Sequence, residues 1–113
     1  MKRDDTVYLR HIRDAIGAVA DYLKGVDEEE FKRNRLLQDG VIRQVQIIGE
    51  ATKRLSPGFR ERHSHVPWSD IAAMRDKLVH DYFGVDVDTV WLTAIEDLPP
   101  LGREIDRLLE TPQ

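Results

Sequence analysis

The chain has 113 residues, a length that suits one domain, and we expect residues 1–113 to form a single helical domain. Its net charge of −4, with 34% charged and 41% hydrophobic residues, argues against a protein that coats nucleic acid through many phosphate contacts. The chain has no cysteine, which excludes disulfides, thiolate zinc sites and a cysteine nucleophile.

The first expected helix covers residues 6–24. Apolar residues recur there at spacings of three and four and form one stripe: Leu9, Ile12, Ile16, Val19, Leu23 and Val26. Asp4 or Asp5 is positioned to cap the start of this helix, and Gly25 suits its end. Asp27, with Glu30 three residues on, predicts the beginning of another helix.

A second long helix is expected at about residues 35–55. Its buried side comprises Leu37, Val41, Val45, Ile48, Ala51 or Thr52, and Leu55. Gly40 and Gly49 lie inside it, although a glycine costs about 1 kcal/mol relative to alanine in a helix. These glycines therefore indicate a close approach to another helix, before "SPG" at 56–58 ends the element.

A third helix is expected over residues 67–83, "PWSDIAAMRDKLVHDYF", beginning at Pro67 or Ser69. Asp88 is expected to cap the next helix, and Pro99 and Pro100 are expected to break or kink the chain before the last one. The last helix turns four residues inward: Leu98, Leu101, Ile105 and Leu108. The fold class is thus all-α, an antiparallel bundle of four to five helices.

No stretch approaches the roughly 20 apolar residues that span a bilayer. The N-terminal residues "MKRDDTVYLR" lack the apolar region of a signal peptide. We therefore expect a cytoplasmic protein with no membrane partner.

The stretch "MRDKLVHDYF" at residues 74–83 concentrates chemically active side chains. On a regular helix Asp76 and His80 share a face, so the carboxylate would fix the imidazole tautomer. Arg75 and His80 are about 140° apart on such a helix and are not ideal neighbours. A second copy of the chain would instead bring two such segments together.

This set of side chains suits a phosphodiester. Arginine holds phosphate oxygens and balances growing negative charge, and histidine transfers protons near neutral pH. RNA supplies its own nucleophile, the 2′-hydroxyl, so Arg75 and His80 would cleave it without a metal or a cofactor. The plainer reading is a solvated helix face whose ion pairs contribute a few tenths of a kcal/mol.

Arg75, His80 and Tyr82 form an R-x4-H-x-Y pattern that resembles the motif of HEPN-domain toxins, specifically the HepT-like family. Three longer segments share the resemblance: "DGVIRQVQIIGEATKRLS" (39–56), "VPWSDIAAMRDKLVHDYFGVDVDTVW" (66–91) and "DLPPLGREI" (97–105). Together they extend the resemblance over about residues 5–109.

The resemblance implies an α-helical homodimer that acts as the toxin of a toxin–antitoxin pair. It implies a metal-independent endoribonuclease in which Arg75 and His80 are catalytic and meet in a cleft at the dimer interface. It also implies an MNT-type nucleotidyltransferase antitoxin that adds AMP to Tyr82, which otherwise supports the cleft. Asp76, expected to orient His80, replaces the asparagine common in the family and partly offsets the charge of Arg75.

Five basic residues are candidates for RNA binding: Lys53, Arg54, Arg60, Arg62 and Lys77. A solvated loop explains those at 53–62 equally well. His63 and His65 are candidates for binding a metal or guiding RNA, although histidines two apart in a loop usually bind nothing, and we expect no metal. Trp68 and Trp91 read as core or interface anchors.

A second function remains open from the sequence alone. The chain would then be a non-catalytic helical binding module that partners a nucleotidyltransferase or a nucleotide. RNA cleavage in EDTA separates the two functions.

Overall fold

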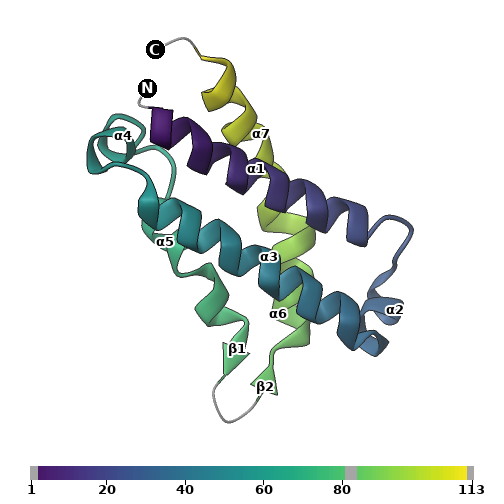
Figure 1. Ribbon diagram of the computed structural model, residues 1–113. Helices are drawn as coiled ribbons and strands as arrows, with labels where there is room; N and C mark the ends of the chain where they lie inside the picture. The colour runs from purple at the N-terminus through teal and green to yellow at the C-terminus, as the bar shows by residue number, and fades with distance from the viewer. Residues whose placement is uncertain (1–2, 81–83, 112–113) are drawn as a thin grey trace.

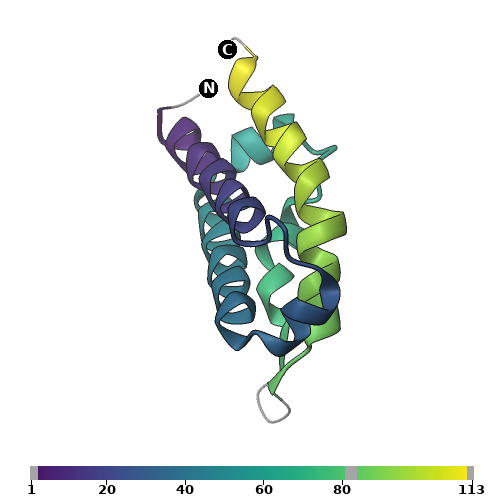
Figure 2. The ribbon, with the colours of Figure 1, turned by 90° about the vertical axis from the view of Figure 1, so that its right-hand side faces the viewer.

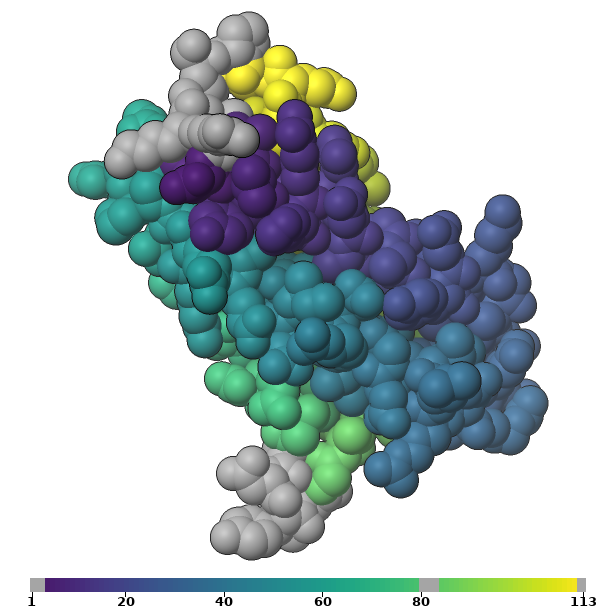
Figure 3. Space-filling view, in the orientation of Figure 1, coloured from purple at the N-terminus to yellow at the C-terminus, as the bar shows by residue number. Residues whose placement is uncertain are grey.

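Three long helical segments form the bundle in the computed structural model, which describes residues 3–80 and 84–111. Helix α1 (Arg3–Tyr22) packs against α3 (Arg35–Arg54) and against α7 (Leu98–Glu110), and both partners run opposite to α1 (Figures 1 and 2). The space-filling view shows α1 and α3 side by side along one face (Figure 3). The predicted all-α class is confirmed. Within the described ranges, no helix is long and apolar enough to cross a membrane.

Shorter elements connect these helices. They are α2 (Glu28–Arg33), α4 (Pro57–Arg62), α5 (Trp68–Ala72), the 3₁₀-helix η1 (Met74–Lys77), α6 (Val87–Leu92) and the π-helix η2 (Thr93–Asp97). Strands β1 (Val79–His80) and β2 (Gly84–Val85) form a small antiparallel pair. Side chains cap three of the short helices: Asp27 accepts from the amide of Glu30, Ser56 from that of Phe59, and Asp86 from that of Thr89.

Two predicted caps are wrong. Asp86 caps α6 in place of Asp88, which lies inside the helix and forms an ion pair with Lys32 at 3.2 Å. Helix α1 includes Arg3, so Asp4 and Asp5 belong to its first turn and do not precede it. Gly25 follows α1 with a φ of +74°, a left-handed conformation that glycine adopts without steric cost.

The apolar stripes predicted for the long helices meet in the core. Helix α1 buries Leu9, Ile12, Ala15 and Val19; α3 buries Val41, Val45, Ile48, Ala51 and Thr52; α7 buries Leu98, Leu101, Ile105 and Leu108. The remaining residues of the α1 stripe are partly buried and pack against this core: Ile16, Leu23 and Val26. Periodicity at three and four therefore identified the inward faces correctly.

The glycines of α3 mark close contacts, as predicted. A Cβ placed on Gly49 would lie 2.9 Å from the carbonyl oxygen of Ala72, at the end of α5. A Cβ on Gly40 would lie 3.3 Å from the ring of Tyr22. Gly49 thus allows the backbones of α3 and α5 to approach each other.

The sequence predicted a break or a kink at Pro99 and Pro100, and the break is wrong. They occupy the first turn of α7, and α6, η2 and α7 follow one another without interruption from Val87 to Glu110. The helix thus changes from π to α geometry directly before two residues that have no N–H to donate. The intervening π-helix η2 absorbs the change in hydrogen bonding between the two α-helices.

The third predicted helix is wrong beyond Ala72. Helix α5 ends there, and the amides of Asp76 and Leu78 bond to the carbonyls of Ala73 and Arg75, the three-residue spacing of a 3₁₀ turn. The carbonyl of Leu78 then accepts the amide of Asp86 across the hairpin, at 2.9 Å. Gly84, with φ +78°, begins the returning strand. Pairing between the two strands has overridden the helical pattern.

Candidate functional site

The motif residues occupy the narrow segment that leads from α5 into the hairpin. Arg75, Asp76 and Lys77 belong to η1, and the backbone of His80 ends β1, paired with Gly84. Tyr82 lies outside the described residues. Arg75 and His80 are thus carried by two different elements, because the chain changes from 3₁₀-helix to strand between them.

The side chain of Arg75 is partly exposed to solvent and partly enclosed by the protein. The side chain is 44% exposed, but Nε is buried and has no hydrogen-bond partner within the described part of the chain. An enclosed donor without a partner costs about 1–3 kcal/mol. Among the described residues, the carboxylate of Asp76 pairs with Arg75, with Oδ1 4.0 Å from Nη1. The side chain of Arg75 is therefore enclosed at Nε and partly open to solvent elsewhere.

Asp76 does not share a helical face with His80, and that predicted arrangement is wrong. The helix ends four residues before Asp76, and its side chain is 79% exposed beside Arg75. In this position the carboxylate reduces the positive charge that Arg75 offers to a phosphate. Lys77, two residues after Arg75, is exposed and adds a positive charge to the same short helix.

The other basic candidates lie at the opposite end of the molecule. Lys53 and Arg54 end α3, and Arg60 and Arg62 belong to α4, which lies at the far end of the bundle from β1 and β2 (Figures 1 and 2). Arg60 resembles Arg75 in having a buried Nε without a described hydrogen-bond partner. Within one subunit the structure does not bring these four residues to the motif.

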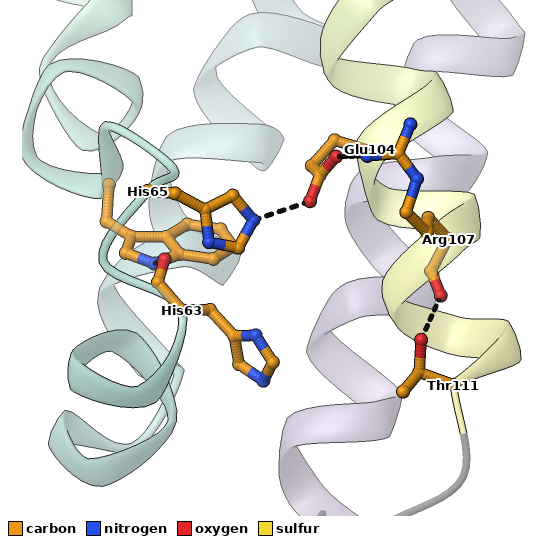
Figure 4. Close-up of polar contacts among 6 residues, drawn as sticks. His63, His65, Glu104, Arg107 and Thr111 are labelled. Carbon is orange, nitrogen blue, oxygen red and sulfur yellow. Dashed lines mark hydrogen bonds and ion pairs between the residues drawn. The ribbon is translucent and has the colours of Figure 1, made fainter.

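His63 and His65 lie in the loop that follows α4, and His65 connects this loop to α7. His65 Nε2 is 2.7 Å from Glu104 Oε1, and Arg107 Nη1 is 2.6 Å from Glu104 Oε2, so one carboxylate bridges the loop and α7 (Figure 4). The ring of His63 lies 4.5 Å from that of Phe59, and its carbonyl accepts the indole N–H of Trp68. These contacts give the pair a structural role.

The electrostatics around His63 disfavour its protonation. Burial lowers its pKa below the ordinary value of 6.5, and the neighbouring His65 and Arg62 lower it further, while Glu104 acts in the opposite direction. The described residues contain no group of three histidine, aspartate or glutamate side chains arranged to hold a metal ion. The predicted anchor Trp68 is buried, and Trp91 is partly buried against Phe31.

Residues 12–108 match the family model described as "Ribonuclease HepT-like". The chain belongs to the HepT-like ribonuclease family. The match covers most of the sequence, including α3, η1, both strands and nearly all of α7. No solved structure matches this HepT-like chain.

Named relatives of this HepT-like chain carry ribonuclease names. "Probable ribonuclease HepT" of Thermococcus cleftensis is 41% identical over 108 residues, covering 96% of this chain and 98% of the relative. "Putative RNase" of Caldanaerobacter subterraneus subsp. tengcongensis is 41% identical over 103 residues, covering 91% and 92%. A "Gamma-glutamylcyclotransferase and putative RNase" of Methanocaldococcus jannaschii is 43% identical over 110 residues, 97% of this chain but 50% of the relative.

Sequence reasoning missed the contacts that tie distant segments of this HepT-like chain. Asp5 is buried and bonds Ser56, and Glu104 joins His65 to Arg107. The one available signal for the first contact was the position of Asp5, four residues before Leu9 and so in line with the apolar stripe of α1. The second has no local signal, because His65 and Glu104 are 39 residues apart.

Proposed function

We propose that this HepT-like protein is a metal-independent endoribonuclease whose catalytic groups are Arg75 and His80. The observation that supports it is the half-exposed guanidinium of Arg75, with an enclosed Nε, on the 3₁₀-helix that leads into the strand carrying His80. Family membership and the names of the relatives support a ribonuclease.

In the proposed reaction the 2′-hydroxyl oxygen of RNA attacks the adjacent phosphorus. A histidine accepts the hydroxyl proton as the P–O5′ bond breaks, and the leaving 5′-oxygen takes a proton from the second histidine of a dimer or from solvent. The products are a 2′,3′-cyclic phosphate and a 5′-hydroxyl. Arg75 binds the phosphate oxygens and stabilises the negative charge that grows in the transition state. The reaction needs no redox partner and no nucleophile other than the 2′-hydroxyl of the RNA.

The proposal includes a homodimer, in which we expect Arg75 and His80 to meet at a cleft between subunits, as the family resemblance implies. Apolar residues at the surface of the single chain leave area for such contact: Leu36 is 82% exposed, Leu92 48% and Ile95 46%. We further propose that the protein is the toxin of a toxin–antitoxin pair in the cytoplasm. Its antitoxin would be an MNT-type nucleotidyltransferase that transfers AMP to Tyr82, blocking an anionic substrate by bulk and charge.

The test incubates purified protein with RNA in EDTA, beside the variants R75A and H80A. Arg103 and His11 are exposed residues outside the motif, so R103A and H11A remove the same side-chain types as matched controls. We expect cleavage that leaves 2′,3′-cyclic phosphate ends, lost in R75A and H80A and kept in both controls. Mass spectrometry of each preparation identifies protein without AMP on Tyr82.

The same experiment tests the rival function. Absence of cleavage by folded, unmodified protein over a broad set of RNAs contradicts the nuclease and supports a non-catalytic binding module. Cleavage that survives both R75A and H80A contradicts the assignment of the catalytic residues. Cleavage that disappears in EDTA contradicts the metal-independent reaction.

A further inference from the structure

A groove separates α5 and η1 from the α6–η2–α7 segment. Its volume is about 520 Å³, within the range of ligand and side-chain binding sites in proteins. Apolar side chains from both walls line it, and Val66, Ile71 and Leu101 are buried members of the core. Met74, partly buried, comes from η1, where it directly precedes Arg75. The groove therefore offers apolar surface beside the segment that carries the motif arginine.

The rim of this groove is acidic. Four carboxylates line it, namely Asp70, Glu96, Asp97 and Glu104, against Lys77 and His65. Glu104 already pairs with His65 and Arg107. Asp70, Glu96 and Asp97 are exposed, and the structure shows no hydrogen bond or ion pair from these three side chains to another described residue. The rim therefore attracts positive charge and repels phosphate.

The π-helix η2 supplies part of this rim. In a π-helix each amide bonds to the carbonyl five residues back, in place of four in an α-helix, and such segments are frequent at functional sites. Thr93, Glu96 and Asp97 of η2 all line the groove. Asp97 also immediately precedes α7, yet its side chain makes no capping hydrogen bond with that helix. Capping of α7 therefore does not account for the carboxylate of Asp97.

We propose that this groove binds a basic amphipathic segment of a partner protein. Apolar side chains of the segment would pack on Ile71, Met74 and Leu101, and its lysines or arginines would face Asp70, Glu96 and Asp97. The groove is an unsuitable RNA site because its carboxylates repel the phosphate backbone. Binding at the groove does not depend on RNA cleavage, so the two proposals stand or fall separately.

The test measures fluorescence anisotropy with a labelled amphipathic helical peptide built from leucine and lysine. E96K/D97K reverses two rim charges, and D14K/D21K reverses two exposed charges on α1 as a control with the same change in net charge. We expect the rim variant to raise the Kd about tenfold or more, and the control to change it less than about twofold. A peptide with glutamate in place of lysine should not bind.

Four outcomes overturn the proposal. In the first, the wild-type protein does not bind the peptide. In the second, both double variants weaken binding equally, which shows that peptide binding depends only on the net charge of the protein. In the third, the wild-type protein binds a single-stranded RNA and E96K/D97K does not, which makes the groove a nucleic-acid site. Sedimentation shows that E96K/D97K alone changes the oligomeric state of the protein, which makes the occupant a second copy of this chain.

Discussion

Asp5 and Ser56, 51 residues apart, are joined by two hydrogen bonds. Asp5 Oδ1 accepts the Ser56 amide at 2.7 Å, and Oδ2 accepts the Ser56 hydroxyl at 2.8 Å. The same hydroxyl oxygen accepts the amide of Phe59 and so caps α4. Asp5 is 1% exposed. One carboxylate thus connects the first turn of α1 to the junction of α3 and α4.

We expect D5A to lower the free energy of unfolding by about 1–3 kcal/mol, because it leaves a partly buried amide and hydroxyl without their charged acceptor. Urea unfolding followed by circular dichroism measures this change. D4A is the matched control, since Asp4 is exposed in the same turn, and it should cost less than about 0.5 kcal/mol. Equal effects of D4A and D5A would contradict the role given to this contact.

We expect G49A to destabilise the protein by about 1–3 kcal/mol, although alanine favours helix, because its Cβ would lie 2.9 Å from a backbone carbonyl. G17A provides the opposite case within α1. A Cβ there meets nothing within 4 Å, so we expect G17A to stabilise by about 1 kcal/mol. Thermal unfolding of both variants checks the pair. Stabilisation by G49A would show that α3 and α5 are not packed so closely.

We expect an equal mixture of R75A and H80A to recover about a quarter of the wild-type cleavage rate if a site takes its arginine from one subunit and its histidine from the other. Half of the dimers would then be mixed, and each would hold one intact site. The rate is measured on RNA after unfolding and refolding the mixture to exchange subunits. No recovery, with mixed dimers confirmed by native mass spectrometry, means that each site is built from a single chain.

We expect D76N to raise the RNA cleavage rate up to about fivefold. The substitution removes a carboxylate 4.0 Å from Arg75, and exposed ion pairs of this kind contribute up to about 1 kcal/mol. Salt screens the pair, so the gain should shrink as ionic strength rises. D14N, at an exposed site on α1, controls for the change in net charge. A slower D76N enzyme would instead show that the carboxylate assists the reaction.

We expect the protein to lose stability below about pH 6.5 in part because of His63. Its pKa is lowered in the folded state, chiefly by burial and then by His65 and Arg62. As the pH falls, the unfolded chain therefore takes up the proton first, and the balance shifts toward unfolding. H63Q should reduce this loss when urea unfolding is compared at pH 7.5 and pH 5. An unchanged pH dependence in H63Q would rule out this contribution.

The sequence alone was enough for the inward faces of α1, α3 and α7, for several caps, and for the motif that points to an RNA-cleaving family. Helical periodicity and capping are local properties, so a window of a few residues contains them. The same reasoning placed Arg75 and His80 on one helix, and there it was wrong. The residues from Met74 to Lys77 have a helical pattern, but none of them indicates that a strand returns at Gly84.

Only the tertiary structure decided which distant groups meet. In the folded chain α5 ends at Ala72, where Gly49 lets α3 approach. The last helix continues through Pro99 and Pro100, directly after a π-helical segment. The tertiary structure also pairs Asp5 with Ser56 and His65 with Glu104. The physical reason is that these contacts join groups tens of residues apart, and their free energy outweighs the local preferences that a sequence pattern records.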